Sequence, residues 1–412
     1  MPEPAYKMVL QMHESSAPRL APSLPIGMLV VLWLVGWTLR VPILAAPPLA
    51  TRIADAFGFG ETGVGALTML PIVAVAFGAI PAAWIIARFG IRLAIAGGLL
   101  VMVAASVARG HVPSTTMLFT VSVVMGLGVA VFQTALPAAT RAWTPTHVAL
   151  GSAVYLNGMM LGELSGAGLT LPLVLPLAGG DWRLSLILWA IPILLIAALV
   201  ALVRLPIEPS NANDIESTRL SSYKSLPSWK DGHVWQYGLL LASSAVAFLA
   251  VNAYSGTLLR ARGETEALGG FLFAYNATPL LASFIVLAAP KWIGLRTPLA
   301  VSAVLSAAGM AGFIFLDSWA SWVAALVTGC AATVELILLV SLPPAIAKGT
   351  AVTRLSAGMT LIGFGIAFAL TLVGGWIADK TSWIEMALIP SLVFMIAALA
   401  ALGRTANYPD YE

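Results

Sequence analysis

The chain has 412 residues, of which 59% are hydrophobic and only 9% are charged, and its mean hydropathy is +0.94. Soluble domains carry about 25% charged residues, so this composition excludes a soluble globular protein and indicates an integral membrane protein. The net charge of +3 is small and gives no reason to expect a nucleic-acid partner.

The sequence contains twelve apolar spans, each close to the ~20 residues that a helix needs to cross a bilayer. Backbone groups in lipid must be paired within the protein, and these runs do not alternate as barrel strands do, so the spans are expected to be helices. The predicted spans are 26–47, 63–86, 92–109, 114–138, 149–177, 184–203, 236–258, 268–289, 298–316, 319–343, 354–377 and 383–402.

One long polar interruption separates six spans from six. It predicts an N-terminal tail (1–25), a six-helix half (26–204), a linker (205–235), a second six-helix half (236–403) and a C-terminal tail (404–412). The halves repeat each other, because a short basic turn follows the second span of each, at 88–92 and at 291–296. A second repeated feature is an acidic residue followed by a basic one between the fifth and sixth spans of each half, in Asp181-Trp182-Arg183 and in Asp379-Lys380. The expected fold class is therefore an all-α membrane protein with two pseudo-symmetric halves.

The positions of Lys and Arg predict the orientation of the chain. Of 21 such residues, fourteen lie on the side that holds both termini and the linker, and Arg40 lies inside a span. Because basic residues concentrate in cytoplasmic loops, both termini are expected in the cytoplasm of a multi-pass inner-membrane protein. The six on the opposite side are Arg52, Arg109, Arg183, Arg260, Arg262 and Lys380.

Two segments carry a family resemblance. Residues 83–92 resemble the loop motif of the major facilitator superfamily, a small residue followed by Asp-Arg-x-Gly-Arg-Arg, with Ala87 in place of the Asp. Leu39-Arg40-Val41-Pro42, followed by 47–49 and 65–71, is similar to the cyanate and 2-nitroimidazole transporter family, whose first helix opens with an Asn-Leu-Arg-Pro-like sequence. Thr38 stands at the Asn position, and Val41 delays the Pro by one residue. The resemblance implies a major facilitator fold with helices 1, 4, 7 and 10 around a central cavity.

Three charged residues lie well inside the predicted spans: Arg40, Glu163 and Glu335. A rise of about 1.5 Å per residue places Arg40 and Glu163 at the same depth, about 21 Å from the cytoplasmic ends of their helices. Asn252 and Asn276 fall within a few ångström of that depth, whereas Glu335 lies about 12 Å in. We therefore expect one polar layer, formed by Arg40, Glu163, Asn252 and Asn276.

Arg40 admits two interpretations. Glu163 at equal depth predicts a structural ion pair, because a lone intramembrane charge is unfavourable. The guanidinium fork also suits a planar, carboxylate-like ligand, which predicts a docking group for a small anion. The two roles can coexist if the pair opens when substrate arrives. Trp33 and Trp37 share a helical face with Arg40, and this stripe is expected either to pack or to wall the substrate site.

Glu335 and Glu163 are the candidates for proton coupling, because burial of a carboxyl favours its protonated form unless a cation holds it charged. Glu335 has no basic residue at its own level and is the preferred carrier. Polar side chains that could contact substrate are Tyr155, Asn157, Asn252, Tyr254 and Asn276. Intramembrane amides more commonly bond to another helix, so a packing role for them stays open.

Glycines mark two further features. Gly158, Gly162 and Gly166 recur every four residues in the fifth span, and this stripe predicts close helix packing, with the eighth span as the expected neighbour. Residues 58–63 fit the G-x-G-x-x-G pattern, but they lie in a loop with no preceding strand, so they do not predict a dinucleotide site.

The sequence thus predicts a secondary active transporter that moves a small anionic or polar planar solute by alternating access, coupled to protons. Its partners are expected to be a small-molecule substrate, protons and the lipid bilayer, with no cofactor, metal or nucleic acid, and it is expected to act as a monomer. One alternative is a multidrug or nitroimidazole-type efflux transporter for neutral or weakly cationic compounds. Alternatives of another class are a membrane-embedded enzyme, for which no converging catalytic set is evident, and a solute sensor.

Overall fold

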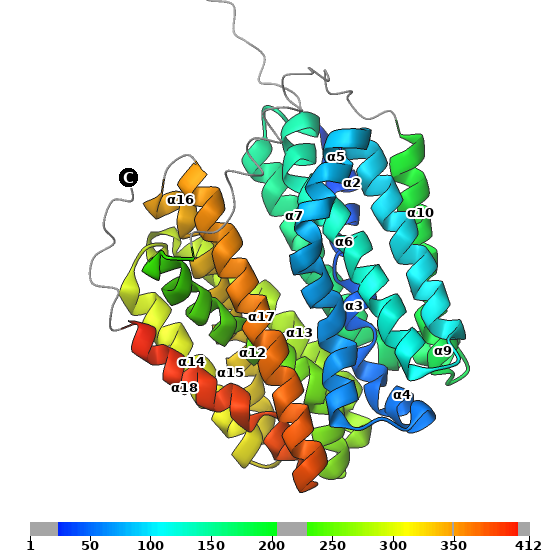
Figure 1. The fold of residues 1–412 in the computed structure, drawn as a ribbon, viewed down its shortest axis with the longest axis vertical. Helices are drawn as coiled ribbons and strands as arrows, with labels where there is room; N and C mark the ends of the chain where they lie inside the picture. The colour runs from blue at the N-terminus through cyan, green and yellow to red at the C-terminus, as the bar shows by residue number, and fades with distance from the viewer. Residues whose placement is uncertain (1–23, 204–228, 348–349, 403–412) are drawn as a thin grey trace, which may run out of the picture.

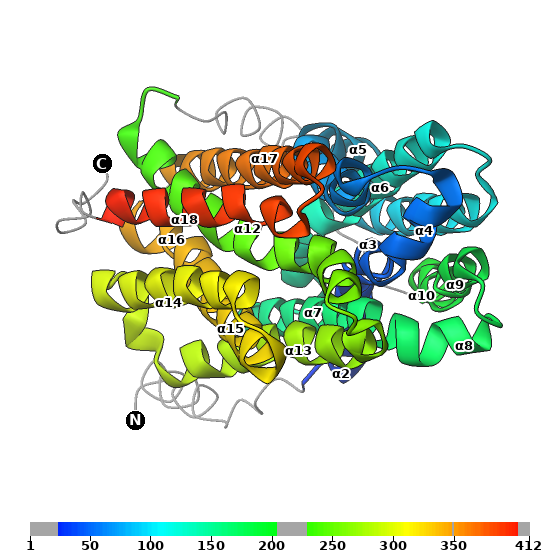
Figure 2. The same cartoon turned by 90° about the horizontal axis from the view of Figure 1, so that it is seen from below.

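The computed structural model describes residues 24–203, 229–347 and 350–402, and every secondary-structure element within these ranges is a helix. The helices form two bundles that lie side by side, one from each half of the chain (Figures 1 and 2). Most of the tails and of the linker predicted at 205–235 lies outside the described residues. The all-helical class and the division into two halves are confirmed.

The first half begins with a helix broken by its prolines. Pro42, Pro47 and Pro48 lack the N–H that an uninterrupted helix requires, so the first span consists of three short pieces and a terminal helix. The elements are α2 (Ile26–Thr38), α3 (Val41–Leu44), η1 (Pro47–Leu49), α4 (Ala50–Phe57), α5 (Glu61–His111), α6 (Thr115–Trp143), α7 (Val148–Glu163), η2 (Leu164–Gly168), η3 (Thr170–Val174), α8 (Leu175–Leu177), α9 (Trp182–Leu188) and α10 (Ala190–Leu202).

The second half repeats this plan with fewer breaks. Its elements are α12 (Gly232–Ala261), η4 (Thr265–Ala267), α13 (Leu268–Ala288), η5 (Pro290–Trp292), α14 (Arg296–Phe315), α15 (Ser318–Val340), α16 (Pro343–Ile346), α17 (Thr350–Thr381), η6 (Ile384–Ala387) and α18 (Ile389–Leu402). The basic turns predicted in both halves are present. Gly90 breaks the long α5 at φ 80°, and Gly294 adopts φ 85° in the equivalent turn. Glycine favours this left-handed backbone because it has no Cβ.

Every predicted span corresponds to a helix. Nine helices among the described residues are long and apolar enough to cross a membrane, and residues 148–168 with 170–177 form a tenth span bent by 53°. The 51-residue α5 accounts for two predicted spans because Gly90 divides it, and α18 is the shorter twelfth helix. The bent span corresponds to the fifth predicted helix, where the α-helix gives way to two π-helical turns.

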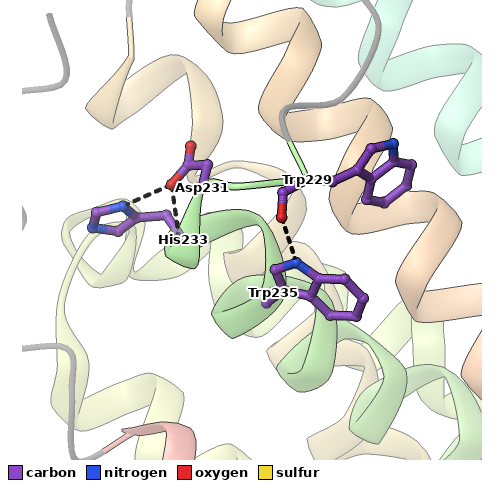
Figure 3. Close-up of polar contacts among 4 residues, drawn as sticks. All are labelled: Trp229, Asp231, His233 and Trp235. Carbon is purple, nitrogen blue, oxygen red and sulfur yellow. Dashed lines mark hydrogen bonds and ion pairs between the residues drawn. The ribbon is translucent and has the colours of Figure 1, made fainter.

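The side on which α10 ends and α12 begins is called the linker side, and the opposite side, with α4, is called the far side (Figure 1). At the linker side Asp231 caps α12 by accepting a 2.9 Å hydrogen bond from the backbone N–H of His233 (Figure 3). Trp235 donates through Nε1 to the carbonyl of Trp229 at 2.9 Å, and both indoles are exposed. Exposed tryptophans are typical of the membrane–water interface, and this pair lies at the start of α12, where the sequence predicts a span to begin.

The two halves meet along two pairs of helices, α5 with α17 and α7–η2 with α13. The glycine stripe lies within the first half instead. A Cβ at Gly158 or at Gly162 would collide with the carbonyl of Trp33 or Trp37, so α7 packs backbone to backbone against α2. The predicted close packing is thus present, but the predicted neighbour for the stripe, the eighth span, was wrong. The eighth span contacts the fifth further along, where Gly168 meets Phe273.

Candidate functional site

Arg40 lies at the break between α2 and α3, near the middle of the first span. Its backbone (φ −117°, ψ −24°) precedes Pro42, which has no N–H to continue the helical hydrogen-bond pattern of α2. The break separates Arg40 from both helical segments and directs its side chain toward the boundary between the halves. Arg40 lines both cavities described below.

Arg40 and Glu163 form an ion pair within the first half, as their equal depth predicted. The Nε of Arg40 lies 3.3 Å from Oε1 of Glu163, and the two side chains are 16% and 13% exposed. Nε makes the closest approach, and it has no hydrogen-bond partner among the described residues. The pair is therefore mainly electrostatic at Nε, and a guanidinium carries five N–H donors in all.

A central cavity of about 220 Å³ lies beside this ion pair. Both halves contribute to its walls, through α3, α5 and α7 on one side and α12, α13, α15 and α17 on the other. Most of the lining is apolar, with Met159, Met160, Phe248 and Phe364 as its largest side chains. Its polar members are the ion pair and the hydroxyl groups of three residues, Ser244, Thr333 and Ser341.

A smaller cavity of about 90 Å³ adjoins the first and shares Arg40, Ile72 and Phe364 with it. Its lining includes Gln133, Thr134 and Thr360, and Oε1 of Gln133 is buried without a hydrogen-bond partner among the described residues. Arg40 thus lies between a large, mainly apolar space and a small one that also contains the polar side chains of Gln133, Thr134 and Thr360. This arrangement suits a solute with an apolar body and one electron-rich end.

The tryptophan stripe and its neighbours on α7 lie outside the cavity lining. Trp33 donates to Oδ1 of Asn157 at 3.1 Å, and Trp37 donates to Oγ of Ser165 at 3.1 Å and packs against Trp189. Tyr155 presents its backbone to α2 at Gly36 and does not line the cavity either. These contacts join helices of the first half to one another, and the predicted binding role of Trp33, Trp37, Tyr155 and Asn157 stays a prediction.

The buried amides of the second half bond to each other. Asn276 donates to Oδ1 of Asn252 at 2.9 Å, and both side chains are fully buried between α12 and α13. The expected polar layer is therefore two separate pairs, one in each half, and only the charged pair reaches the cavity. Tyr254 lies elsewhere again, at the far side, where its hydroxyl donates to the carbonyl of Thr371 at 2.6 Å.

Glu335 is fully buried in α15, and neither of its carboxyl oxygens has a hydrogen-bond partner among the described residues. Its neighbours Ala332, Thr333 and Leu336 line the central cavity, but Glu335 itself does not. It forms no ion pair within the described part of the chain. Glu163, in contrast, lines the cavity and faces a cation.

Arg109 is a residue that the sequence analysis misplaced. It was counted among the basic residues of the opposite loops, but it lies inside α5 and is only 1% exposed. Its Nη1 donates to the carbonyl of Pro42 at 2.9 Å, whereas Nε and Nη2 have no partner among the described residues. Arg109 therefore fastens α3, the segment that follows Arg40. The prolines of the first span could have predicted a buried donor of this kind, because they break the helix and leave backbone carbonyls without an N–H partner.

A larger hollow, about 890 Å³, opens at the far-side surface between residues 263–267 and 318–326. All of its lining residues belong to the second half, so a change in the relative position of the halves would not open or close it. The central cavity is bounded by both halves and contains the intramembrane ion pair. It is therefore the candidate site for a transported solute.

Two helical halves that enclose a cavity between them are the architecture of many membrane transporters. The chain belongs to the Major Facilitator Superfamily, whose family model matches residues 28–361. It is 28% identical over 286 residues to the 2-nitroimidazole transporter of Escherichia coli (strain K12), a match that covers 69% of this chain and 67% of the relative. It is 25% identical over 354 residues to the cyanate transport protein CynX of the same organism, covering 82% and 87%.

Solved structures share the fold at low identity. A D-xylose-proton symporter superposes with a TM-score of 0.74 at 13% identity, covering 94% of this chain and 99% of that one. A bacterial homologue of the human lysosomal transporter Spinster, in an inward-facing and occupied conformation, gives a TM-score of 0.72 at 17% identity, covering 92% and 97%. These likenesses confirm the major facilitator fold.

Proposed function

We propose that this protein is a secondary active transporter that carries a small anionic or polar planar solute across the inner membrane, with Arg40 as the docking group. The observation that supports it most directly is that Arg40 lines a cavity bounded by both halves and lies beside its partner carboxylate with no hydrogen bond at Nε. The remaining N–H groups can bind a carboxylate, nitro or cyanate-like group as a planar fork. The relatives named for 2-nitroimidazole and cyanate transport are consistent with such a solute.

Alternating access follows from the position of the site. A solute bound between the halves becomes accessible from one side or the other when the halves rock against each other. Protons are the proposed coupling ion, with Glu335 and Glu163 as the proposed carriers. Glu163 can exchange its bond to Arg40 for a proton when the solute takes over the guanidinium. Glu335 is close behind the cavity wall and would load and release a proton as water reaches it.

Uptake into proteoliposomes tests the proposal. Cyanate, nitrate, small carboxylates and 2-nitroimidazole are supplied with and without an imposed pH gradient, to protein carrying Arg40→Lys or no change. Arg40→Lys retains the charge but loses the planar fork, so it should weaken solute affinity while the protein still folds. Normal binding and transport by Arg40→Lys would exclude fork docking. The solute panel also identifies the chemical class that the parent protein carries.

A second candidate function is efflux of neutral or weakly cationic planar compounds. The apolar wall formed by Met159, Met160, Phe248 and Phe364 favours it, because such a wall binds an aromatic ring without requiring a charge. In this function Arg40 is structural and Glu163 or Glu335 engages the compound. Transport of 2-nitroimidazole that is unaffected by Arg40→Lys, together with no transport of the anions, would support efflux.

The proposed orientation places the linker side in the cytoplasm, following the bias of basic residues. Single cysteines introduced between residues 205 and 235, in a variant without Cys330, should resist an impermeant maleimide applied to intact cells. Ready labelling of these positions would reverse the orientation.

A further inference from the structure

The far side of the molecule is closed by contacts between the halves, and one side chain makes several of them. Asp379 lies near the C-terminal end of α17, and its carboxylate crosses to the first half. Oδ1 accepts from the backbone N–H of Glu61 at 2.6 Å, and Oδ2 accepts from the N–H of Thr62 at 3.0 Å and from its hydroxyl at 2.5 Å. The N-terminus of α5 is therefore capped by a residue that lies 318 positions after Glu61 in the sequence.

This cap replaces one that α5 does not have locally. The N-cap position of α5 is Gly60, which has no side chain and makes no side-chain hydrogen bond. The first N–H groups of a helix lack intrahelical partners, and an anion beside them also interacts favourably with the helix dipole. Gly60 is also needed for the approach of Asp379, because a Cβ at this position would collide with Oδ1. The glycine that formed part of a misleading dinucleotide pattern thus makes room for the cap.

Below the cap, the halves are in close contact. The buried Tyr254 hydroxyl bonds to Thr371 and lies 3.4 Å from the carbonyl of Glu61. Cβ atoms at Gly65 or Gly375 would overlap this layer, so α5 and α17 approach each other closely here. Beside the cap, Arg260 bonds both oxygens of Asp55 at 3.1 and 2.9 Å, but these side chains are more than half exposed. Asp379 is exposed as well, but its carboxylate accepts three hydrogen bonds, two of them from N–H groups that have no partner within α5, so the helix cap is the more extensive of the two polar contacts.

The corresponding position in the first half does not act in this way. Asp181 lies between the fifth and sixth spans, as Asp379 lies between the eleventh and twelfth, but it caps its own next helix by accepting from the backbone N–H of Arg183 at 2.8 Å. The helix that an equivalent crossing contact would cap, α13, has no side-chain cap. The contact between halves is therefore made at one of the two related positions only.

We propose that Asp379 is the latch of the far-side gate, holding the transporter closed on that side by capping α5 across the boundary between the halves. Opening the far side requires the carboxylate to leave the two N–H groups and the Thr62 hydroxyl. The proposal rests on alternating access, but it is independent of the identity of the solute, since no cavity residue takes part.

Cysteine accessibility tests the latch without any substrate. In a background with Cys330→Ser, Thr371→Cys reports on the far side, because Thr371 is fully buried and its methyl group points at Gly65 of the other half. Ser341→Cys reports on the linker side, where Ser341 lines the central cavity. Maleimide labelling rates of both reporters are measured in purified protein that carries Asp379→Ala, Asp379→Asn, Gly60→Ala or Glu266→Gln.

Asp379→Ala should speed labelling at position 371 between about twofold and thirtyfold, the range expected for loss of a helix N-cap, and should slow labelling at position 341. Asp379→Asn, which retains an acceptor oxygen, should have a smaller effect. Gly60→Ala should act like Asp379→Ala, because it displaces the carboxylate without removing it. Glu266→Gln alters an exposed far-side acid on η4 and should change neither rate.

Unchanged labelling at position 371 in both Asp379→Ala and Gly60→Ala would overturn the proposal. Faster labelling at both reporters would overturn it as well, because it would indicate general loosening rather than a shift toward the far-side-open state. If the accessibilities shift as expected but no solute is transported in proteoliposomes, the latch stands and the proposed function fails.

Discussion

Neutralising Glu163 should destabilise the empty transporter and make its stability depend on a bound anion. Glu163→Gln preserves the shape of the side chain but leaves the guanidinium of Arg40 without a countercharge, in a site where both side chains are less than one-fifth exposed. A charge left alone in such surroundings is unfavourable, so the free energy of unfolding should fall. An anionic solute placed against Arg40 should restore it.

The structure sets the magnitude of the effect. Two unit charges 3.3 Å apart attract each other by about 5 kcal/mol at an effective dielectric constant of about 20, before desolvation is subtracted. Breaking a buried pair by removing one partner costs about 3–5 kcal/mol in other proteins. Because both side chains reach the cavity here, we discount this for screening and expect a loss of about 1–3 kcal/mol.

Unfolding of the purified protein in detergent, followed with and without a panel of small anions, measures the loss and its recovery. The double variant Arg40→Met with Glu163→Gln removes both charges, so it should be more stable than Glu163→Gln alone and should gain nothing from anions. Glu266→Gln serves as the control for removal of an exposed acid. Equal stability of Glu163→Gln and the double variant, with no anion effect in either, would refute the reasoning.

Four further substitutions have definite expectations. Gly162→Ala should destabilise the protein by about 1–3 kcal/mol in the same unfolding assay, because a Cβ at this position meets the Trp37 carbonyl. Gly365 has open space around it, so Gly365→Ala should instead stabilise the protein by up to about 1 kcal/mol. Arg109→Ala should lower the free energy of unfolding by about 2–4 kcal/mol, because it leaves a cavity and an unpaired carbonyl; a loss below about 0.5 kcal/mol, as expected for an exposed arginine, would contradict the burial described. Glu335→Gln should abolish pH-driven accumulation in proteoliposomes but leave solute exchange intact; undiminished accumulation would exclude Glu335 as the carrier.

The fold was predictable because the membrane constrains the sequence so strongly. Spans of about 20 apolar residues, separated by glycine and basic turns, give helix positions directly, and the internal repeats indicate two halves. The Arg40–Glu163 pair was predictable for a related reason. Two opposite charges at the same depth have few other ways to avoid isolation in lipid.

Other parts of the site could not be predicted, because periodicity gives the depth of a residue but not the direction of its helix face. Asn252 and Asn276 have the right depth and bond to each other. Trp33 and Trp37 share a stripe with Arg40 in a continuous helix, but the break before Arg40 directs that side chain elsewhere. Trp33 bonds to Asn157 on α7, and Trp37 bonds to Ser165 on η2. The sequence shows Asp379 only as part of an internal repeat. Its role as the cap of α5 could not be predicted, because the capped helix lies in the other half and no nearby residue pattern marks the contact.

The methionine pair in the wall of the central cavity has a consequence for how readily the protein can acquire new substrates. Met159 and Met160 are unbranched and flexible, so they can fit around solutes of different outline, and a mismatch of one methylene against such a wall changes affinity by only about 1–3 kcal/mol. If this cavity binds the solute as proposed, selection by shape would therefore be weak, and the polar end near Arg40 would supply most of the discrimination. Substitutions at positions 159 and 160 should widen or narrow the range of compounds recognised without disturbing the glycine-packed face of the same helix, which makes this wall the natural starting point for directed evolution.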